Sequence, residues 1–274
     1  MKLIEKIIRI ISLKAKKHNA ETINSKYGWT GNYSSWEAAA NECQGYDAEN
    51  ILERVKDSMI KIKNGEAVYE RDSVLFNKVE YSWGLLSGIL MAAAENKGQL
   101  EVIDFGGSLG STYFQNLKFL KNIKNLNWTV VEQAHFVACG KELFSDDTLK
   151  FENEISEAIS NKESPVLILS SVLQYLENAH DFIREIMQYR FPFILIDRTA
   201  FISGKSERIM LQRVPPEIYE ASYPTRFFSE HDFLSNFYSD YELMADFASF
   251  SDGSQKTDDG RKLYWKGFIL RRKI

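Results

Sequence analysis

The spacing of apolar residues changes near residue 96. Between residues 20 and 95 the apolar positions follow helical or irregular spacing, and we predict no strand there. From residue 100 onward, short apolar segments alternate with helical stretches. We therefore place a boundary at the turn "NKGQ", residues 96–99, and expect an N-terminal helical cap over residues 1–95 and one α/β domain over residues 96–274.

Seven strands are expected after this boundary. Helical patterns separate the first five, whereas a polar loop joins the last two, residues 240–247 and 262–271. Repeated strand, helix, strand units form a parallel sheet with helices on both faces. The prediction is a Rossmann-like, doubly wound, mostly parallel seven-stranded sheet with a C-terminal antiparallel hairpin. The first five strands are expected near residues 100–105, 126–132, 148–152, 165–171 and 192–198.

The stretch from Thr199 to Phe228 is long and poorly periodic, and it contains Pro215, Pro216 and Pro224. It follows the fifth predicted strand. In open α/β sheets the loops at the carboxyl ends of the strands form the binding surface. We therefore predict a substrate-facing loop in this stretch.

The segment "MKLIEKIIRIISLKAKK", residues 1–17, has the spacing of a basic amphipathic helix. Such a helix packs on its own domain or on a partner, or it makes a peripheral contact with an anionic membrane surface. Both interpretations stay open. Charged residues interrupt the apolar positions, so we expect no signal peptide. The longest apolar run, residues 85–94, is far shorter than the roughly 20 residues that span a bilayer, and we predict a buried helix.

Composition narrows the classes of function. The chain has 34 Lys and Arg residues against 38 Asp and Glu residues, so no overall positive field favours nucleic acid as a partner. Cys43 and Cys139 have no metal-ligand spacing around them. We therefore predict no metal site and no disulfide framework, and a reducing, cytoplasmic setting.

A glycine-rich turn, "VIDFGGSLG", follows the first predicted strand. A dinucleotide fingerprint has glycines at positions 1, 3 and 6, and counting back from Gly110 gives Gly107 at position 3 but Phe105 at position 1. Asp104 at the strand end would also repel a pyrophosphate. A carboxylate there suits a cofactor that carries an ammonium or sulfonium group and no phosphate.

The turn resembles the first motif of the class I S-adenosylmethionine-dependent methyltransferases, an acid followed by small residues on alternate positions. Here Ser108 replaces the commoner middle glycine. Glu132 ends the second predicted strand 22 residues after Gly110, and "VLILSSVLQYLEN", residues 166–178, is similar to the family's fourth motif. The resemblance implies S-adenosylmethionine as cofactor, with Glu132 on the ribose hydroxyls. It implies these cofactor-binding residues: Asp104, Gly106, Gly107, Ser108, Gly110, Glu132, Gln133, Ser170 and Ser171.

A narrower resemblance is to a methyltransferase family usually found among bacterial surface-polysaccharide genes. It rests on "GWTGNYSSWEAA", "YSWGLLSGIL", "FGGSLG", "VVEQ", "SSVLQYL" and "LIDRTAF". This resemblance favours a glycan or glycolipid acceptor. Our leading hypothesis is O-methylation of a saccharide or lipid-linked saccharide at the inner membrane face. A cofactor-binding scaffold without catalysis is the alternative. A nicotinamide-dependent sugar-modifying enzyme is disfavoured by Asp104 and Phe105.

Methyl transfer from a sulfonium is an in-line displacement, so the enzyme aligns the acceptor atom and removes a proton from a hydroxyl acceptor. The candidate bases are His231, Asp197 and His180. The alternative for both histidines is a surface position in the first turn of a helix. Candidates for acceptor binding are Arg198, Tyr223 and Arg226. Arg198 suits a carboxylate or phosphate, or it forms an ion pair with Asp197 that holds the following loop.

Other aromatic and titratable residues have weaker assignments. The segment "YGWTGNYSSW", residues 27–36, suits either sugar stacking or packing over the core, and we favour packing. His135 is expected to pack or to lie beside the adenine, and His18 belongs to the basic amino-terminal segment. Candidate lid contacts are Tyr69, Arg71 and Phe76.

Overall fold

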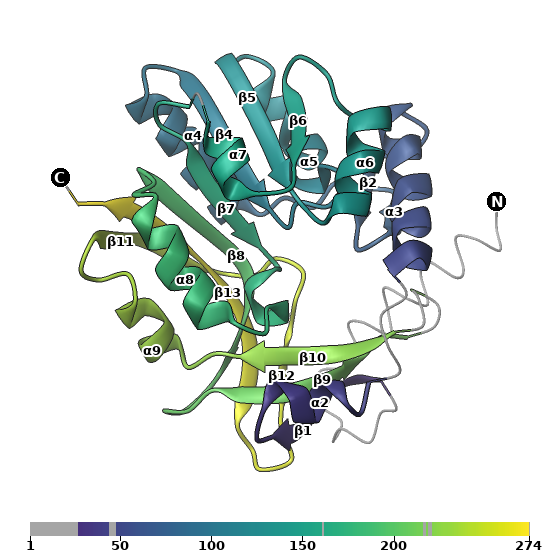
Figure 1. Ribbon diagram of the computed structural model, residues 1–274, viewed down its shortest axis with the longest axis vertical. Coiled ribbons are helices and arrows are strands. Elements are labelled where there is room, and N and C mark those ends of the chain that lie inside the picture. The colour runs from purple at the N-terminus through teal and green to yellow at the C-terminus, as the bar shows by residue number, and fades with distance from the viewer. Residues whose placement is uncertain (1–26, 44–47, 161, 216–217, 219–220, 274) are drawn as a thin grey trace.

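The computed structural model describes residues 27–43, 48–160, 162–215, 218 and 221–273. A twisted, mostly parallel sheet forms its centre (Figure 1). The sheet order is β11-β13-β8-β7-β4-β5-β6, with β12 paired to β13 beside this path. The parallel strands are β4 (Gln99–Phe105), β5 (Lys124–Val131), β6 (Leu149–Glu152), β7 (Val166–Ser170) and β8 (Phe193–Ile202).

The C-terminal hairpin closes one edge of the sheet. β11 (Tyr241–Ala248) and β13 (Lys262–Arg272) pair antiparallel, and β13 lies antiparallel to β8. The short strand β12 (Ser254–Lys256) lies in the connection between them. Each of the seven strands predicted after residue 96 has a counterpart in this sheet, but the predicted number is met only in part, because β12 adds an eighth strand. The strand order reverses between β4 and β7, and such a switch point leaves a crevice at the carboxyl ends of the strands.

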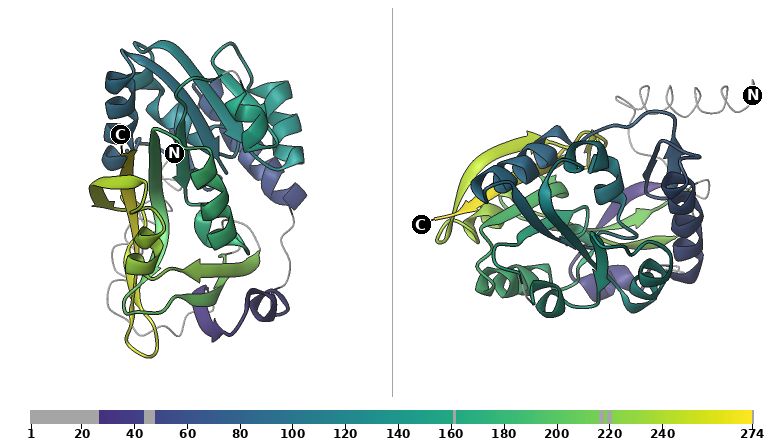
Figure 2. Two further views of the ribbon diagram at one scale, coloured as in Figure 1. Left: turned by 60° about the vertical axis from the view of Figure 1, so that its left-hand side comes forward. Right: turned by 90° about the horizontal axis from the view of Figure 1, so that it is seen from above.

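Helices cover both faces of the sheet (Figures 1 and 2). One apolar cluster joins the sheet to α3 (Ala48–Lys63), α4 (Trp83–Glu95), α5 (Ser111–Leu120) and α6 (Ala134–Leu143). A second cluster joins the opposite face to α7 (Ile155–Ile159), α8 (Ala179–Gln188) and α9 (Glu230–Ser235). The buried helix expected over residues 85–94 is therefore α4. Because helices cover both faces of the sheet, side chains on both sides of each parallel strand are buried, and the strands are apolar at nearly every position.

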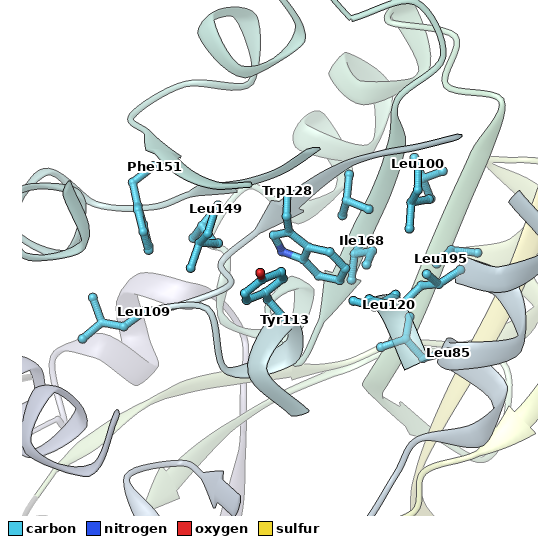
Figure 3. Packing of buried hydrophobic residues seen from close by; sticks show 14 of the residues in the cluster. Leu85, Leu100, Leu109, Tyr113, Leu120, Trp128, Leu149, Phe151, Ile168 and Leu195 are labelled. Atoms are coloured by element: carbon cyan, nitrogen blue, oxygen red, sulfur yellow. The ribbon is translucent and has the colours of Figure 1, made fainter. Parts of the chain in front are cut away.

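Alternate strand residues enter the two clusters. In β4, Val102 belongs to the first cluster and Ile103 to the second. Figure 3 shows the first cluster, in which the Trp128 indole of β5 lies beside the Tyr113 ring of α5 at a centroid separation of 5.7 Å. This alternation decides which side chain at each strand end faces α4, α5 and α6.

The prediction of no strand before residue 96 is wrong. β1 (Gly28–Tyr33) pairs with β9 (Arg208–Arg213), which pairs in turn with β10 (Ser222–Phe227). β2 (Tyr69–Arg71) and β3 (Val74–Phe76) form a separate hairpin. β1 is an edge strand rich in glycine and polar residues, and β2 and β3 have three residues each, so none shows a clear apolar alternation.

The expected loop over residues 199–228 is likewise replaced by structure, because β8 continues to Ile202 and β9 and β10 follow. Pro224 lies within β10, an edge strand, where the missing N–H is tolerated. Trp29 of β1 packs against Trp265 at 4.7 Å between ring centroids and against Phe227 at 6.1 Å. Pairing of β1 with β9 crosses the expected boundary at residue 96, and the division into two units stays a prediction.

The remaining short elements are α2 (Trp36–Ala40) and the 3₁₀ helix η1 (Leu173–Tyr175). The Ser35 hydroxyl caps α2 by accepting the Ala38 N–H at 3.1 Å. Within the described part of the chain, no helix is both long and apolar enough to cross a membrane. The basic segment of residues 1–17 and His18 lie outside the described residues.

Candidate functional site

A cavity of about 1560 Å³ lies at the switch point of the sheet. One wall consists of the glycine turn and the ends of β4, β7 and β8; another contains residues of β9, β10, β12 and β13. Pockets that take one small molecule usually measure about 300–1,000 Å³. The cavity therefore has room for two molecules side by side.

Three polar side chains occupy the ends of adjacent strands on the same face of the sheet. Asp104 on β4, Ser170 on β7 and Asp197 on β8 each follow, by two positions, a residue of the first apolar cluster. Because side chains alternate with a period of two, all three face the side of the sheet covered by α4, α5 and α6. All three line the cavity.

Asp104 is fully buried, with 0% of its surface exposed. Its Oδ2 accepts a hydrogen bond from Trp128 Nε1 at 3.2 Å, and its Oδ1 has no partner among the described residues. Burial raises the pKa of Asp104 to about 7, the Trp128 hydrogen bond opposes the shift, and the nearby Glu132 adds to it. The site therefore holds a buried carboxyl oxygen that a cationic donor would satisfy.

The glycine turn leaves room for this carboxyl group. A methyl group on Gly107 would lie 2.6 Å from Asp104 Cγ, and one on Gly106, whose φ is +72°, would lie 2.6 Å from Val172. Ser108 has a φ of +56° and Gly110 one of +91°. Gly106, Gly107 and Ser108 line the cavity, whereas Gly110 precedes α5 and is not among the residues that line it. The backbone thus approaches the cavity closely above Asp104.

Gly107→Ala should lower the free energy of unfolding by about 1–3 kcal/mol, because the new methyl group overlaps the Asp104 carboxyl group. Thermal denaturation followed by circular dichroism measures the change. Gly253→Ala is the matched control, since its methyl group would meet nothing within 4 Å, and it should change stability by less than about 0.5 kcal/mol. Equal melting temperatures for the two variants would contradict the close packing of Asp104 under the turn.

Glu132 follows β5 at the edge of the cavity, beside Gln133. Its Oε2 accepts the Gln133 backbone N–H at 2.8 Å, and the Ser108 backbone N–H also donates to the carboxyl group. Burial raises the pKa of Glu132, and these two hydrogen bonds limit the rise. The carboxyl group is therefore oriented by the turn and keeps lone pairs for a ligand.

A hydrogen-bonded junction joins the ends of β7 and β8. The Ser171 backbone N–H donates to the Asp197 carbonyl at 3.0 Å, and the Arg198 N–H donates to Asp197 Oδ1 at 3.0 Å. Asp197 is 1% exposed. Burial raises the pKa of Asp197 to about 6, against the effects of Arg198 and of a hydrogen bond from Ser82. Asp197 is therefore a buried carboxyl group that is ionised near neutral pH.

Arg198 holds three separate segments together. Its Nη2 lies 2.9 Å from Asp72 in the β2–β3 hairpin, and its Nε lies 3.0 Å from Asp252 in the loop after β11. Burial lowers the pKa of Arg198, but these two carboxylates outweigh it and hold the pKa above its ordinary value. The ion-pair interpretation thus describes the observed contacts, with Asp72 and Asp252 as partners in place of the Asp197 side chain. Arg198 also lines the cavity.

Glu70, which was not among the predicted site residues, lines the cavity from β2. Its Oε2 accepts the Ser111 hydroxyl at 2.7 Å and its Oε1 the Ser73 N–H at 2.6 Å. Burial raises the pKa of Glu70 to about 7, and both hydrogen bonds oppose the shift. Asp72 and Ser73 both have positive φ, as a two-residue hairpin turn requires. The aspartate at this turn was a weak sequence signal for the hairpin.

The candidate lid contacts lie on the same hairpin. Tyr69 and Arg71 line the cavity, and Phe76 packs on both, at 5.5 Å between ring centroids for Tyr69 and 4.7 Å from the Arg71 guanidinium carbon. Gln115 of α5 donates to the Tyr69 hydroxyl at 3.2 Å. The hairpin therefore covers the beginning of α5 next to the glycine turn.

Polar and aromatic side chains line the opposite side of the cavity. Gln212 Oε1 accepts hydrogen bonds from the Tyr175 hydroxyl at 3.1 Å and from Thr225 at 3.2 Å. Tyr223 packs edge-on against Tyr175 at 5.2 Å between ring centroids. Trp29 also lines the cavity, and its indole N–H is buried without a partner among the described residues. Of the expected acceptor-binding residues, the cavity therefore contains Arg198 and Tyr223.

Arg226, His180 and His231 are not among the residues that line the cavity. His180 Nε2 lies 2.8 Å from Glu207, and Arg226 also pairs with Glu207 and donates to the Glu177 carbonyl at 3.0 Å. The His231 side chain is 89% exposed and contacts Asp232 in the first turn of α9. The structure thus places both histidines in the first turns of helices, which was the alternative interpretation, and separates them from Asp197.

His135, three residues after Glu132, is also not among the residues that line the cavity. His135 packs against Phe136 at 5.0 Å between ring centroids, and its Nε2 is buried without a partner in the described part of the chain. No group of three or more His, Cys, Asp or Glu side chains among the described residues has the arrangement of a metal site.

No family model and no curated protein matches this chain. Solved structures with a similar fold include a 1,6-didemethyltoxoflavin-N1-methyltransferase from Burkholderia thailandensis, bound to 1,6-didemethyltoxoflavin and S-adenosylhomocysteine. It is 12% identical, covers 93% of this chain and 99% of its own, and has a TM-score of 0.47. An S-adenosylmethionine-dependent methyltransferase from Clostridium acetobutylicum is 11% identical over 82% of this chain and 99% of its own, with a TM-score of 0.43. The strand order of the chain itself describes a doubly wound α/β fold with a mostly parallel central sheet and an antiparallel hairpin at one edge.

Proposed function

We propose that this protein transfers a methyl group from S-adenosylmethionine to a hydroxyl group of a small-molecule acceptor. The observation that carries the proposal is Asp104, a fully buried carboxyl group with one unpartnered oxygen at the switch point of the sheet. A cofactor with phosphates would meet this acid and Glu132 at unfavourable close range. A cofactor with an ammonium group would complete the hydrogen bonding of Asp104.

The residues around the glycine turn fit the parts of such a cofactor. Asp104 would accept the ammonium group. Gly106 and Gly107 line the same cavity and have no side chain, so the backbone of the turn would be open to the cofactor. Glu132, held by two backbone N–H groups, would accept the ribose hydroxyls. Gln133, Ser170 and Ser171 line the same cavity and would complete the contacts.

When bound, S-adenosylmethionine supplies an electrophilic methyl group on a sulfonium. Asp197 is the base that the geometry favours, because it is buried, lines the cavity and has its pKa raised to about 6, near working pH. It would take the proton of the acceptor hydroxyl as that oxygen gains the methyl group. The β2–β3 hairpin and the Arg198 ion pairs would exclude water from this step.

The acceptor class that we propose is a saccharide or lipid-linked saccharide of surface-polysaccharide biosynthesis, methylated on the cytoplasmic side of the membrane. Tyr175, Gln212 and Tyr223 provide hydroxyl, amide and ring groups of the kind that bind sugar hydroxyls and sugar faces. A peripheral membrane contact through residues 1–17 is part of this proposal.

The test is calorimetric titration with S-adenosylmethionine and, separately, with NAD. We expect S-adenosylmethionine to bind with a micromolar dissociation constant, that is about −8 kcal/mol, and NAD to show no measurable binding. NAD binding without S-adenosylmethionine binding would refute the proposal. Binding of the cofactor with no S-adenosylhomocysteine formation on any nucleotide sugar or methyl glycoside would favour the non-catalytic scaffold.

A further inference from the structure

The side chain of Gln174 holds a fixed and unpartnered hydrogen-bond acceptor. Its Nε2 donates to the Arg198 carbonyl at 3.1 Å and to Ser171 Oγ at 3.3 Å. The Arg198 carbonyl can only accept, so the amide cannot turn its oxygen toward it. Gln174 is 1% exposed, and its Oε1 has no partner among the described residues.

This acceptor belongs to the same junction as Asp197. Gln174 contacts the Arg198 carbonyl, the Arg198 N–H donates to Asp197 Oδ1, and both side chains line the cavity. A buried acceptor without a partner costs about 1–3 kcal/mol. A ligand that offers a donor to each of the two groups would recover this cost.

We propose that the acceptor molecule carries two neighbouring hydroxyl groups, one facing Asp197 and the other donating to Gln174 Oε1. This inference rests on the proposed function and adds the substrate class, a vicinal diol. The first hydroxyl oxygen gains the methyl group of S-adenosylmethionine as the carbon–sulfur bond breaks, sulfur keeps the electron pair, and Asp197 takes the proton. Gln174 sets which hydroxyl is presented, and it is a specificity residue.

The experiment compares the binding of cis-1,2-cyclohexanediol and cyclohexanol to protein saturated with S-adenosylhomocysteine, by ligand-observed saturation-transfer NMR titration. Wild-type protein should bind the diol roughly 3- to 10-fold more tightly, the size of one added hydrogen bond. Gln174→Met should remove this preference. Its matched control is Gln188→Met, at an exposed position at the end of α8, which should retain it.

Equal binding of the two probes, binding of neither, or a preference that survives in Gln174→Met would overturn the diol inference. Tighter binding of cis-2-aminocyclohexanol than of the diol would overturn it in favour of an amine acceptor. Gln174→Met should keep the S-adenosylhomocysteine affinity and the melting temperature of the wild-type protein. A lost diol preference in such a variant then reflects the missing contact and not a damaged fold. Failure of the proposed function gives a different result, because calorimetry then detects no cofactor binding by wild-type protein.

Discussion

Asp104→Asn should weaken S-adenosylmethionine binding roughly 10- to 150-fold, the value of a hydrogen bond to a charged group. The neutral amide can still accept the Trp128 N–H, which Asp104 accepts at 3.2 Å, but it cannot pair with an ammonium group. Calorimetric titration at pH 8 measures the loss. Asp181→Asn is the matched control, since the Asp181 side chain is 68% exposed on α8. Equal affinities of Asp104→Asn and wild-type protein would remove the basis of the cofactor assignment.

The same substitution should stabilise the protein at pH 8. Folding raises the pKa of Asp104 from 3.8 to about 7. Between pH 3.8 and pH 7 the folded protein therefore binds a proton at Asp104 that the unfolded chain does not. The stability contributed by the protonated group is complete below pH 3.8, is lost as the pH rises through 7, and is absent at pH 8. Asn carries no charge to bury. We expect Asp104→Asn to be more stable at pH 8 by about 2–4 kcal/mol, measured by thermal denaturation, with the difference shrinking toward pH 5.

The pH dependence of cofactor binding has the opposite sign. The Asp104 carboxylate is the form that pairs with an ammonium group, so affinity should fall as the pH drops below 7, approaching tenfold per unit. Asp104→Asn should lack this dependence. An affinity that stays constant from pH 8 to pH 5.5 in wild-type protein would show that Asp104 does not contact the cofactor as an anion.

The sheet was predictable because its strands are buried on both faces. Runs such as "VLILS" and "FILID" are apolar at nearly every position, and their ends fell within a few residues of the expected ones, although β8 runs on to Ile202. β1 and the β2–β3 hairpin were not predicted, because an edge strand and three-residue strands bury too few side chains to produce a periodic pattern of apolar residues. Their positions depend on tertiary pairing with β9 and with each other.

The site residues likewise divide into those that could be predicted from local sequence and those that depend on tertiary contacts. Asp104, Glu132 and Asp197 could be singled out because an acid at the carboxyl end of a buried strand faces the switch point of the sheet. Glu70 and Gln174 could not be singled out from the sequence. Each is positioned in the site by a hydrogen bond with a residue far away along the chain, Glu70 with Ser111 and Gln174 with the Arg198 carbonyl. His180 and His231 were selected for their residue type and for their positions after the fourth motif and after the proline-containing stretch, but neither lines the cavity.

Asp197→Asn should lower kcat roughly 10²- to 10⁴-fold with little change in S-adenosylmethionine affinity, because it removes a base that acts only on the acceptor. S-adenosylhomocysteine formation with the best nucleotide sugar or methyl glycoside acceptor measures the rate, and Asp181→Asn again serves as control. The pKa of Asp197 is raised to about 6, so wild-type kcat should fall as the pH drops below 6, where the carboxylate gains a proton. Full activity of Asp197→Asn together with inactivity of His231→Ala would move the role to an exposed histidine outside the cavity. We expect the opposite result, an inactive Asp197→Asn and an active His231→Ala. Asp197 lines the cavity and is linked through Arg198 to Gln174 by two hydrogen bonds, so it lies beside the space where an acceptor would bind.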